Sequence, residues 1–270
     1  MPEPRPRLGV AGWPVAHSRS PAMQNAALRA VGLDDWRYQL LPLPPALFAE
    51  TVRALAPAGF RGINVTIPHK QAALGLATAA SDRARAIGAA NTLVFDPPAG
   101  ITADNTDAPA LIAALPVPAR NRSALVLGAG GSARAAIWAL REAGAEPVHV
   151  WNRTRERAER LAAELGARPS AGDGVQADLL INCTAVGLGA ADDPFAELPL
   201  SADALREYEC VVDLVYGERE TRLVRAARER AVPVVEGREL LVRQGALSFE
   251  QFTGRPASVA TMRQAVAAPR

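Results

Sequence analysis

Strand-like and helix-like segments alternate along almost the whole chain, and this alternation most constrains the fold. Short apolar runs such as RLGVAG (7–12), RGINVTI (61–67), SALVLG (123–128) and CVVDLVY (210–216) are each followed by a longer stretch with helical periodicity. Such alternation is typical of α/β proteins whose sheets are mostly parallel. Residues 90–105 differ, because ANTLVF and GITADN predict a short hairpin.

The alternating elements form two series, which meet near residue 106. A chain of 270 residues is long enough for two ordinary domains. The final segment RELLVRQGALSFEQFTG (238–254) is helical in period and no predicted strand follows it, so we expect it to return to the first domain. The sequence therefore predicts an N-terminal α/β domain followed by a doubly wound one.

Charge and composition exclude several classes of protein. The net charge is +2, so no strong attraction to nucleic acid or to a membrane surface is built in. We find no run of 18 uncharged apolar residues and no apolar stretch of signal-peptide length at the start. Cys183 and Cys210 lie in apolar runs and are interpreted as buried residues of a reducing compartment, not as ligands of a metal. We therefore expect a soluble cytoplasmic protein without a metal.

A glycine-rich loop in the second half, VLGAGGSARAA (126–136), has the spacing G-x-G-x-x-A at Gly128, Gly130 and Ala133. The spacing alone is weak, but here it follows a predicted strand and opens a predicted helix within a βαβ unit. Glycines let backbone N–H groups approach a pyrophosphate, and the helix dipole favours the anion. The sequence predicts a dinucleotide site, with a tight turn that binds nothing as the alternative.

The end of the following strand indicates which dinucleotide binds. NAD-binding domains usually carry Asp or Glu there, whereas this strand is followed by Asn152, Arg153 and Thr154, with further arginines close behind. A guanidinium pairs well with a 2′-phosphate. Cations at a helix start oppose its dipole, so a bound anion explains them better than a solvated helix end does. We expect NADP.

Lys70 is the single lysine among 30 Lys and Arg residues and lies in NVTIPHKQAAL (64–74), in the first turn of a helix predicted to open with Pro68. The helix dipole disfavours a cation there, which makes a purely structural role an odd choice. Lysine can give up a proton, whereas arginine in effect cannot. The sequence favours an acid–base role for Lys70; chance survival of one lysine in an arginine-rich chain is the alternative.

Polar residues also gather where predicted strands end, which is where ligands bind in α/β sheets. The asparagines at such positions are Asn64, Asn91, Asn105, Asn152 and Asn182. Asp107 follows at the junction of the two halves, so we expect it to face a cleft between domains.

Nine segments occur in the order found in shikimate dehydrogenases: GWPVAHSRSPAMQN, GINVTIPHK, AIGAANTLV, DNTD, GAGGSAR, NRT, INCTAVG, DLVY and ELLVRQGALSF. The chain resembles this family from Gly12 to about Phe249. The resemblance implies a substrate-binding domain of residues 1–106 plus 238–270 and a Rossmann-type NADP-binding domain of residues 107–237. It also implies NADPH-dependent reduction of 3-dehydroshikimate to shikimate, in the pathway to aromatic amino acids. We expect a monomer or homodimer.

The resemblance assigns roles to residues of the first domain and its neighbours. Ser18 and Ser20, assisted by Tyr216, would bind the substrate carboxylate. The ring hydroxyls would bond to Thr66, Asn91, Asp107 and Gln244. Lys70 and Asp107 correspond to the catalytic pair of the family, and Lys70 would also contact the substrate.

The cofactor-binding positions that the resemblance implies fall in three groups. The phosphate loop is Gly128, Ala129, Gly130, Gly131, Ser132 and Ala133. The adenosine phosphate site is Asn152, Arg153, Thr154 and Arg157. Thr184, Val186, Leu214 and Gly237 would lie in loops along the cofactor.

The chain departs from the family pattern at two places. Gln24-Asn25 replaces the usual His-Asn on a helix that we do not expect to contact substrate. Asp107 is followed by Ala108, Pro109 and Ala110 where a glycine is usual, which bears on how the linking helix begins.

Three other functions fit parts of the sequence. A quinate or aminoshikimate dehydrogenase would share most motifs, although an NAD-preferring quinate enzyme should carry an acid near position 153. A catalytically silent NADP-binding regulator should have lost Lys70 or Asp107, and both are present. A dehydrogenase with a tyrosine–lysine pair needs a tyrosine at helical spacing before Lys70, and none is there.

Overall fold

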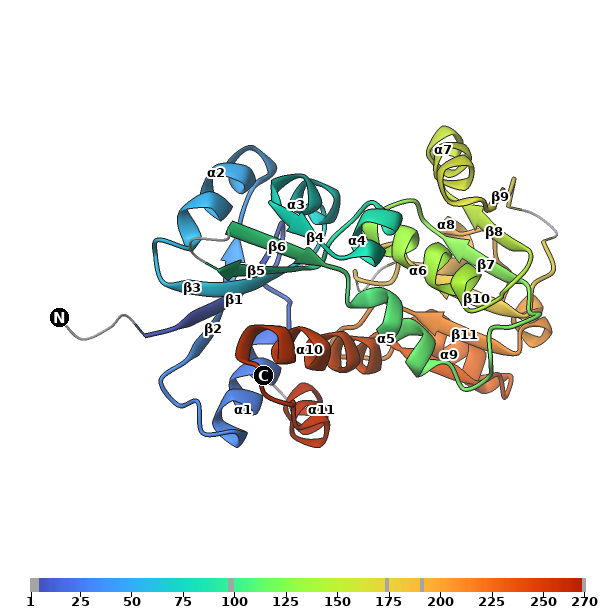
Figure 1. The fold of residues 1–270 in the computed structure, drawn as a ribbon. Helices are drawn as coiled ribbons and strands as arrows, with labels where there is room; N and C mark the ends of the chain where they lie inside the picture. The colour runs from blue at the N-terminus through green and yellow to red at the C-terminus, as the bar shows by residue number, and fades with distance from the viewer. Residues whose placement is uncertain (1–4, 97–99, 173–174, 190–191, 269–270) are drawn as a thin grey trace. The chain divides into compact units, whose positions relative to one another are not determined.

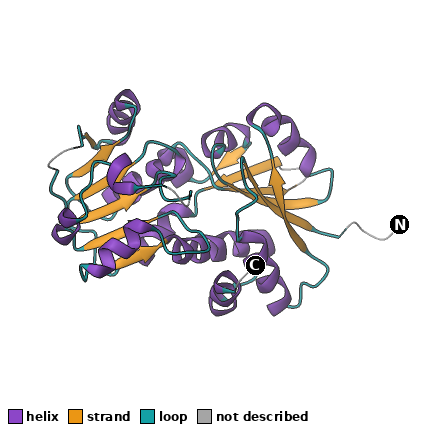
Figure 2. Ribbon diagram, turned by 180° about the vertical axis from the view of Figure 1, so that it is seen from behind, coloured by secondary structure: helices purple, strands orange, loops and turns teal. Residues whose placement is uncertain are grey.

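The computed structural model describes residues 5–96, 100–172, 175–189 and 192–268. Contacts divide the chain into two compact units: unit 1 is Met1–Thr106 with Leu241–Arg270, and unit 2 is Asp107–Leu240. Over the described residues each unit has one six-stranded sheet with helices on both of its faces (Figures 1 and 2). The predicted α/β fold class is confirmed.

The sheet of unit 1 has the order β2-β1-β3-β5-β6-β4. β1 is parallel to β2 and β3, whereas β5 is antiparallel to both β3 and β6, which confirms the predicted hairpin. The strands are β1 (Arg7–Gly12), β2 (Arg37–Pro42), β3 (Phe60–Val65), β4 (Ala79–Ala80), β5 (Thr92–Asp96) and β6 (Gly100–Asp104).

Helices of unit 1 bury two apolar clusters, one on each face of the sheet. Phe48 and Val52 of α2 pack with Ala73 of α3 on one face, and Met23 of α1 packs with Phe249 of α10 and Met262 of α11 on the other. The helices are α1 (Ser20–Ala30), α2 (Pro45–Leu55), α3 (Lys70–Leu76), α4 (Asp82–Ile87), α10 (Gly237–Thr253) and α11 (Val259–Ala267). Because α10 runs from the end of unit 2 into unit 1, the predicted return of the C-terminal helix is confirmed.

The sheet of unit 2 has the order β12-β11-β10-β7-β8-β9, and all its neighbouring pairs are parallel. Read from the other edge, this is the 3-2-1-4-5-6 order of a Rossmann fold, whose strand order reverses between the first and fourth strands. The strands are β7 (Ala124–Leu127), β8 (Val148–Trp151), β9 (Arg168–Pro169), β10 (Leu179–Asn182), β11 (Cys210–Asp213) and β12 (Val234–Glu236).

Helices pack on both faces of this sheet as well. Leu111, Ile137 and Leu161 of α5, α6 and α7 pack on one face, while Leu205 and Leu223 of η1 and α9 pack on the other. The helices are α5 (Asp107–Ala114), α6 (Gly131–Glu142), α7 (Arg155–Leu165), α8 (Pro194–Glu197), the 3-10 helix η1 (Asp203–Glu207) and α9 (Arg222–Glu229). None of the helices within the described ranges is long and apolar enough to cross a membrane.

One local prediction was wrong. The helix predicted to open with Pro68 begins two residues later, at Lys70, with His69 as its N-cap residue. The Ile67–Pro68 peptide bond is cis and belongs to the turn that precedes the helix. A cis proline in a tight turn leaves little trace in a sequence pattern, because proline is also common in the first turn of a helix.

Candidate active site

Four predicted site segments meet at the side of the unit 1 sheet where β1, β3 and β6 end, which we call the edge of this sheet. Because β5 runs antiparallel to its neighbours, its amino end lies beside the carboxyl ends of β3 and β6, with Asn64 opposite Thr92 and Thr92 opposite Asp104. Ser18 follows β1, Thr66 and Lys70 follow β3, Asn91 precedes β5, and Thr106 follows β6. The sheet therefore places the substrate residues predicted in these segments at a common edge.

The turns after β1 and β3 are bound to each other. The Thr66 amide donates to Ala11 O at 2.9 Å, and the Trp13 amide donates to Ile67 O at 3.0 Å. A Cβ on Gly12 would lie 2.4 Å from Cγ2 of Thr66, so a glycine is required for this close approach. Thr66 is thereby held against the turn that leads to Ser18.

Ser18 and Ser20 sit where α1 begins. The Ser20 amide donates to Ser18 Oγ at 3.2 Å, which leaves the Ser18 hydroxyl hydrogen available to another acceptor. Between them, the Arg19 guanidinium donates to the carbonyls of Ala265 (3.3 Å) and Val266 (3.4 Å) in α11. The C-terminal helix therefore anchors the serine segment.

Gln24, at the first departure from the family pattern, is fully buried in α1. Its Nε2 donates to the carbonyl of Gly245 at 2.9 Å, so it joins α1 to α10 within unit 1. Among the described residues its Oε1 has no hydrogen-bond partner.

Lys70 is the first residue of α3 and is 8% exposed. Its carbonyl accepts a hydrogen bond from the Ala90 amide at 2.8 Å, which brings the start of α3 beside the segment that carries Asn91. The neighbouring His69 ring stacks on Phe48 with centroids 4.1 Å apart, and its Nε2 lies 2.7 Å from Leu43 O. Burial lowers the pKa of His69, so this ring packs as a neutral group and holds the turn before Lys70.

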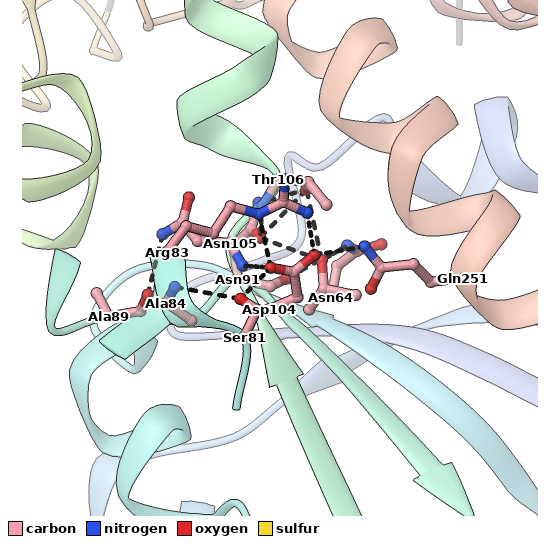
Figure 3. A network of polar contacts seen from close by, with 11 residues as sticks. Asn64, Ser81, Arg83, Ala84, Ala89, Asn91, Asp104, Asn105, Thr106 and Gln251 are labelled. Carbon is pink, nitrogen blue, oxygen red and sulfur yellow. Dashed lines mark hydrogen bonds and ion pairs between the residues drawn. The ribbon is translucent and has the colours of Figure 1, made fainter. Parts of the chain in front are cut away.

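Asn91 is the centre of a buried hydrogen-bond network (Figure 3). Its Oδ1 accepts from the Thr106 amide at 2.8 Å, and its Nδ2 donates to Thr106 Oγ1 at 3.0 Å and to Gln244 Oε1 at 3.4 Å. Asn64 adjoins this group, since its Nδ2 donates to Asn91 O at 3.3 Å. The structure thus brings two predicted substrate residues, Asn91 and Gln244, into contact, together with the residue before Asp107.

A charged cluster that the sequence did not predict adjoins this network (Figure 3). The Asp104 carboxylate accepts from Ser81 Oγ (2.5 Å), from Nε and Nη2 of Arg83 (2.7 Å for Nε), and from Gln251 Nε2 (2.6 Å). Burial opposes ionisation of Asp104, but the hydrogen bonds from Arg83 and Ser81 prevail and hold its pKa below the usual value. Asp104 is therefore a buried anion with full hydrogen-bond satisfaction.

The glycine-rich loop of unit 2 lies where the strand order reverses. Gly128 follows β7 with φ +106°, a conformation that favours glycine, and a Cβ there would lie 3.2 Å from Cys183 O after β10. Gly130 is the N-cap residue of the 12-residue helix α6, no side chain caps this helix, and a Cβ on Gly130 would meet nothing within 4 Å over the described residues. The turn also includes Ala129, and the first three residues of α6 are Gly131, Ser132 and Ala133. A helix start without a side-chain cap and the space beside Gly130 fit a phosphate.

The segment after β8 fits a second anionic group. Arg153 and Arg157 are exposed, and neither side chain forms a hydrogen bond or ion pair within the described ranges. Arg155, by contrast, donates to Glu159 at 2.8 Å. Thr154 is the N-cap residue of α7 without a side-chain cap bond, and Asn152 Nδ2 donates to its carbonyl at 2.9 Å. Glu156 stands in the first turn of α7, but the strand end itself carries no carboxylate.

Buried polar residues connect the loops after β10 and β11. Asn182 Nδ2 donates to Asp213 at 2.9 Å, while its Oδ1 accepts from Thr184 Oγ1 at 2.7 Å. The Val186 amide donates to Thr184 Oγ1 at 3.2 Å, and the Leu214 amide donates to Asn182 O at 3.0 Å. Burial raises the pKa of Asp213 to about 6. The predicted positions Thr184, Val186 and Leu214 thus share one network.

Three further predicted site residues, Gly237, Tyr216 and Asp107, belong to unit 2. A Cβ on Gly237 would lie 2.5 Å from Leu214 O, so α10 begins in close contact with the loop after β11. Tyr216, half-buried in that loop, and Asp107, the first residue of α5, belong to unit 2, whereas the other predicted substrate residues belong to unit 1.

Three family models match the chain. The "Shikimate dehydrogenase substrate binding domain" matches residues 10–93, "Shikimate / quinate 5-dehydrogenase" matches residues 113–184, and "Shikimate 5'-dehydrogenase C-terminal domain" matches residues 237–267. A curated protein of Methylobacterium radiotolerans, "Shikimate dehydrogenase (NADP(+))", is 43% identical over 97% of each chain.

Solved structures are similar over almost the full length. Shikimate 5-dehydrogenase of Thermus thermophilus, in complex with NADP(H) and shikimate, is 40% identical with a TM-score of 0.86 over 96% of this chain and 98% of that one. Shikimate dehydrogenase of Aquifex aeolicus is 30% identical with a TM-score of 0.89 over 99% of this chain and 100% of that one.

Proposed function

The chain belongs to the shikimate dehydrogenase family, and we propose that it catalyses the reversible NADPH-dependent reduction of 3-dehydroshikimate to shikimate. The observation that carries this proposal is the edge of the unit 1 sheet, where hydroxyl and amide side chains from two loops and from α10 are held by a common network. A polyhydroxylated acid needs such a site, because polar groups at fixed positions reject ligands that leave them unpaired.

We assign substrate binding to residues of this edge and to Tyr216. Ser18 donates its hydroxyl hydrogen to the substrate carboxylate, since its oxygen already accepts from the Ser20 amide at 3.2 Å. Ser20 and Tyr216 assist in binding the carboxylate. Thr66, Asn91, Asp107 and Gln244 bind the ring hydroxyls, and the fixed orientation of the Asn91 amide supports this assignment.

Lys70 and Asp107 are the proposed acid–base pair. In the reductive direction Lys70 Nζ gives a proton to the oxygen that develops negative charge at the reacting carbonyl, and in the oxidative direction it takes the proton back. A lysine suits this role where an arginine does not, because the guanidinium holds its protons. Asp107 orients the ammonium and the reacting hydroxyl.

NADPH, when bound, supplies the hydride. The loop from Gly128 to Ala133 would hold its pyrophosphate, and Asn152, Arg153, Thr154 and Arg157 would hold the adenosine 2′-phosphate. Thr184, Val186, Leu214 and Gly237 would line the remaining length. The absence of a carboxylate at the end of β8 supports NADP over NAD.

A matrix of substrates and cofactors tests the proposal. Shikimate and quinate are each supplied with NADP and with NAD, and reduced cofactor is followed by its absorbance. We expect shikimate with NADP to give the highest kcat/KM by far. A preference for quinate would identify a quinate dehydrogenase, and no reduction with any pair would support a silent NADP-binding protein. We place the protein in the cytoplasm. We expect a monomer or homodimer, and light scattering measures the molar mass that distinguishes the two.

A further inference from the structure

Helix α10 presents three polar side chains along one face. Gln244, Ser248 and Gln251 are spaced i, i+4 and i+7, which places them on a common stripe. Each contacts a different part of the unit 1 sheet edge: Gln244 accepts from Asn91 at 3.4 Å, Ser248 donates to Asn64 at 3.3 Å, and Gln251 donates to Asp104 at 2.6 Å. Three polar contacts therefore hold this face of α10 against the sheet edge.

The bond from Gln251 is the strongest of the three. It is the shortest, and its acceptor is an ionised carboxylate, whereas the other two bonds join neutral groups at the outer limit of hydrogen-bond length. Asp104 cannot move to follow the helix, because Arg83, Ser81 and the Asn105 amide also bond to its carboxylate. The contact at Gln251 thus ties the C-terminal half of α10 to the end of β6, in addition to the core packing of Phe249 and the bond from Gln24 to Gly245 O.

Asp104 also belongs to the segment that carries the site. Its carbonyl accepts from the Asn91 amide at 3.1 Å, and Thr106, two residues later, bonds to Asn91 Oδ1. The Asp104 carboxylate therefore stands at the end of β6, the strand that leads to Asp107, and is hydrogen-bonded to the helix that carries Gln244 (Figure 3).

We propose that Gln251 is a positioning residue for substrate binding: through its bond to the Asp104–Arg83 pair it fixes α10 so that Gln244 lies at the substrate hydroxyls. This inference rests on the proposed function, since it takes Gln244 to be a substrate ligand. Gln251 itself lies about two helical turns from Gln244 and acts through it.

The first experiment compares Gln251→Met with the matched variant Glu250→Met. Methionine keeps the length and helix propensity of glutamine but removes the donor, and Glu250 is the exposed neighbour on the same helix. We expect Gln251→Met to raise KM for shikimate roughly tenfold, the lower range for losing a charge-assisted hydrogen bond, with KM for NADP within about twofold. Glu250→Met should match wild type. An unchanged KM for shikimate in Gln251→Met overturns the proposal.

A double-mutant cycle distinguishes positioning from general destabilisation. If Gln251 acts through Gln244, adding Gln251→Met to Gln244→Ala should change KM for shikimate by less than about twofold. If the two effects multiply, Gln251 affects binding by another route and the proposal fails.

A third measurement does not depend on activity. Backbone amide hydrogen exchange in the unliganded protein should become faster around Gln244 in Gln251→Met, while Glu250→Met leaves it unchanged. If the wild-type protein is inactive on shikimate but Gln251→Met still makes exchange around Gln244 faster, the proposed function is refuted and the role of Gln251 in placing α10 stands. Unchanged exchange at residues 241–248 would refute that role even in an active enzyme.

Discussion

The backbone amide of Thr106 donates to Asn91 Oδ1 at 2.8 Å, one residue before Asp107. Asn91 comes from the start of β5 and Thr106 from the end of β6, so this bond closes the open end of the hairpin. The same asparagine donates to Gln244 Oε1 at 3.4 Å. One amide side chain therefore connects the segment of the proposed acid–base carboxylate with the helix that carries a proposed substrate ligand.

Asn91→Ala should impair both stability and substrate binding. The variant leaves the buried Thr106 amide without its acceptor, which costs about 1–3 kcal/mol. We expect urea unfolding to show this loss and KM for shikimate to rise at least tenfold. Thr102→Val, at an exposed position of β6, is the control and should change neither quantity. A stable Asn91→Ala protein with normal KM would remove Asn91 from the site.

Ser18→Ala and Ser20→Ala should weaken shikimate binding. Each loses a hydrogen bond to a carboxylate, worth roughly 1.5–3 kcal/mol, which corresponds to about 10–150-fold in affinity. Titration of each variant with shikimate measures the loss, and NADP affinity, measured in parallel, should hardly change. Undiminished shikimate binding in both variants would show that the carboxylate binds elsewhere.

Arg153→Asp should raise KM for NADP and spare KM for shikimate. The exposed guanidinium has no partner among the described residues, and the substitution places a carboxylate where it repels a 2′-phosphate. Arg160→Asp, on the exposed side of α7 further along the helix, is the control for added negative charge. If the two variants had the same KM for NADP, Arg153 would have no specific role.

The buried carboxyl of Asp213 should make stability depend on pH. Burial raises the pKa of Asp213 from 3.8 to about 6 in the folded protein, so between these values folding takes up a proton. The free energy of unfolding, relative to Asp213→Asn, should therefore decrease as pH rises from about 4 to about 6, by up to about 3 kcal/mol. Urea unfolding across this range measures it, with the exposed Asp82→Asn as control. A constant difference between wild type and Asp213→Asn contradicts the buried acid.

The alternation of strands and helices was sufficient to predict the fold class. Periodicity reports burial on one face of an element, and each long helix of this chain has such a face. The short elements β4, α4, β9 and α8 were not predicted, because two to six residues carry too little periodicity. The start of α3 was placed two residues early, because a proline in a cis turn resembles a proline in a first helical turn.

The prediction of the site had a different limit. The lone lysine and the strand ends made Lys70 and Asn91 candidates for the site, and the family resemblance added Gln244. The Asp104 cluster was missed because its partners Arg83 and Gln251 lie 21 and 147 residues away in the sequence. Only the folded chain shows that this carboxylate is paired and buried.

Lys70→Arg provides the most direct test of the proposed chemistry, since all the other Lys and Arg positions of the chain are arginine. Arginine keeps the charge but cannot exchange a proton near neutral pH. Because Lys70 is 8% exposed, the unfolding midpoint and NADP affinity of the variant are measured first and should stay close to wild type. The decisive measurement is then kcat for shikimate oxidation with saturating NADP. We predict a fall of roughly 10²–10⁴-fold, the range for losing general acid–base catalysis. A folded, NADP-binding Lys70→Arg protein that keeps more than about half of the wild-type kcat would contradict proton transfer by Lys70.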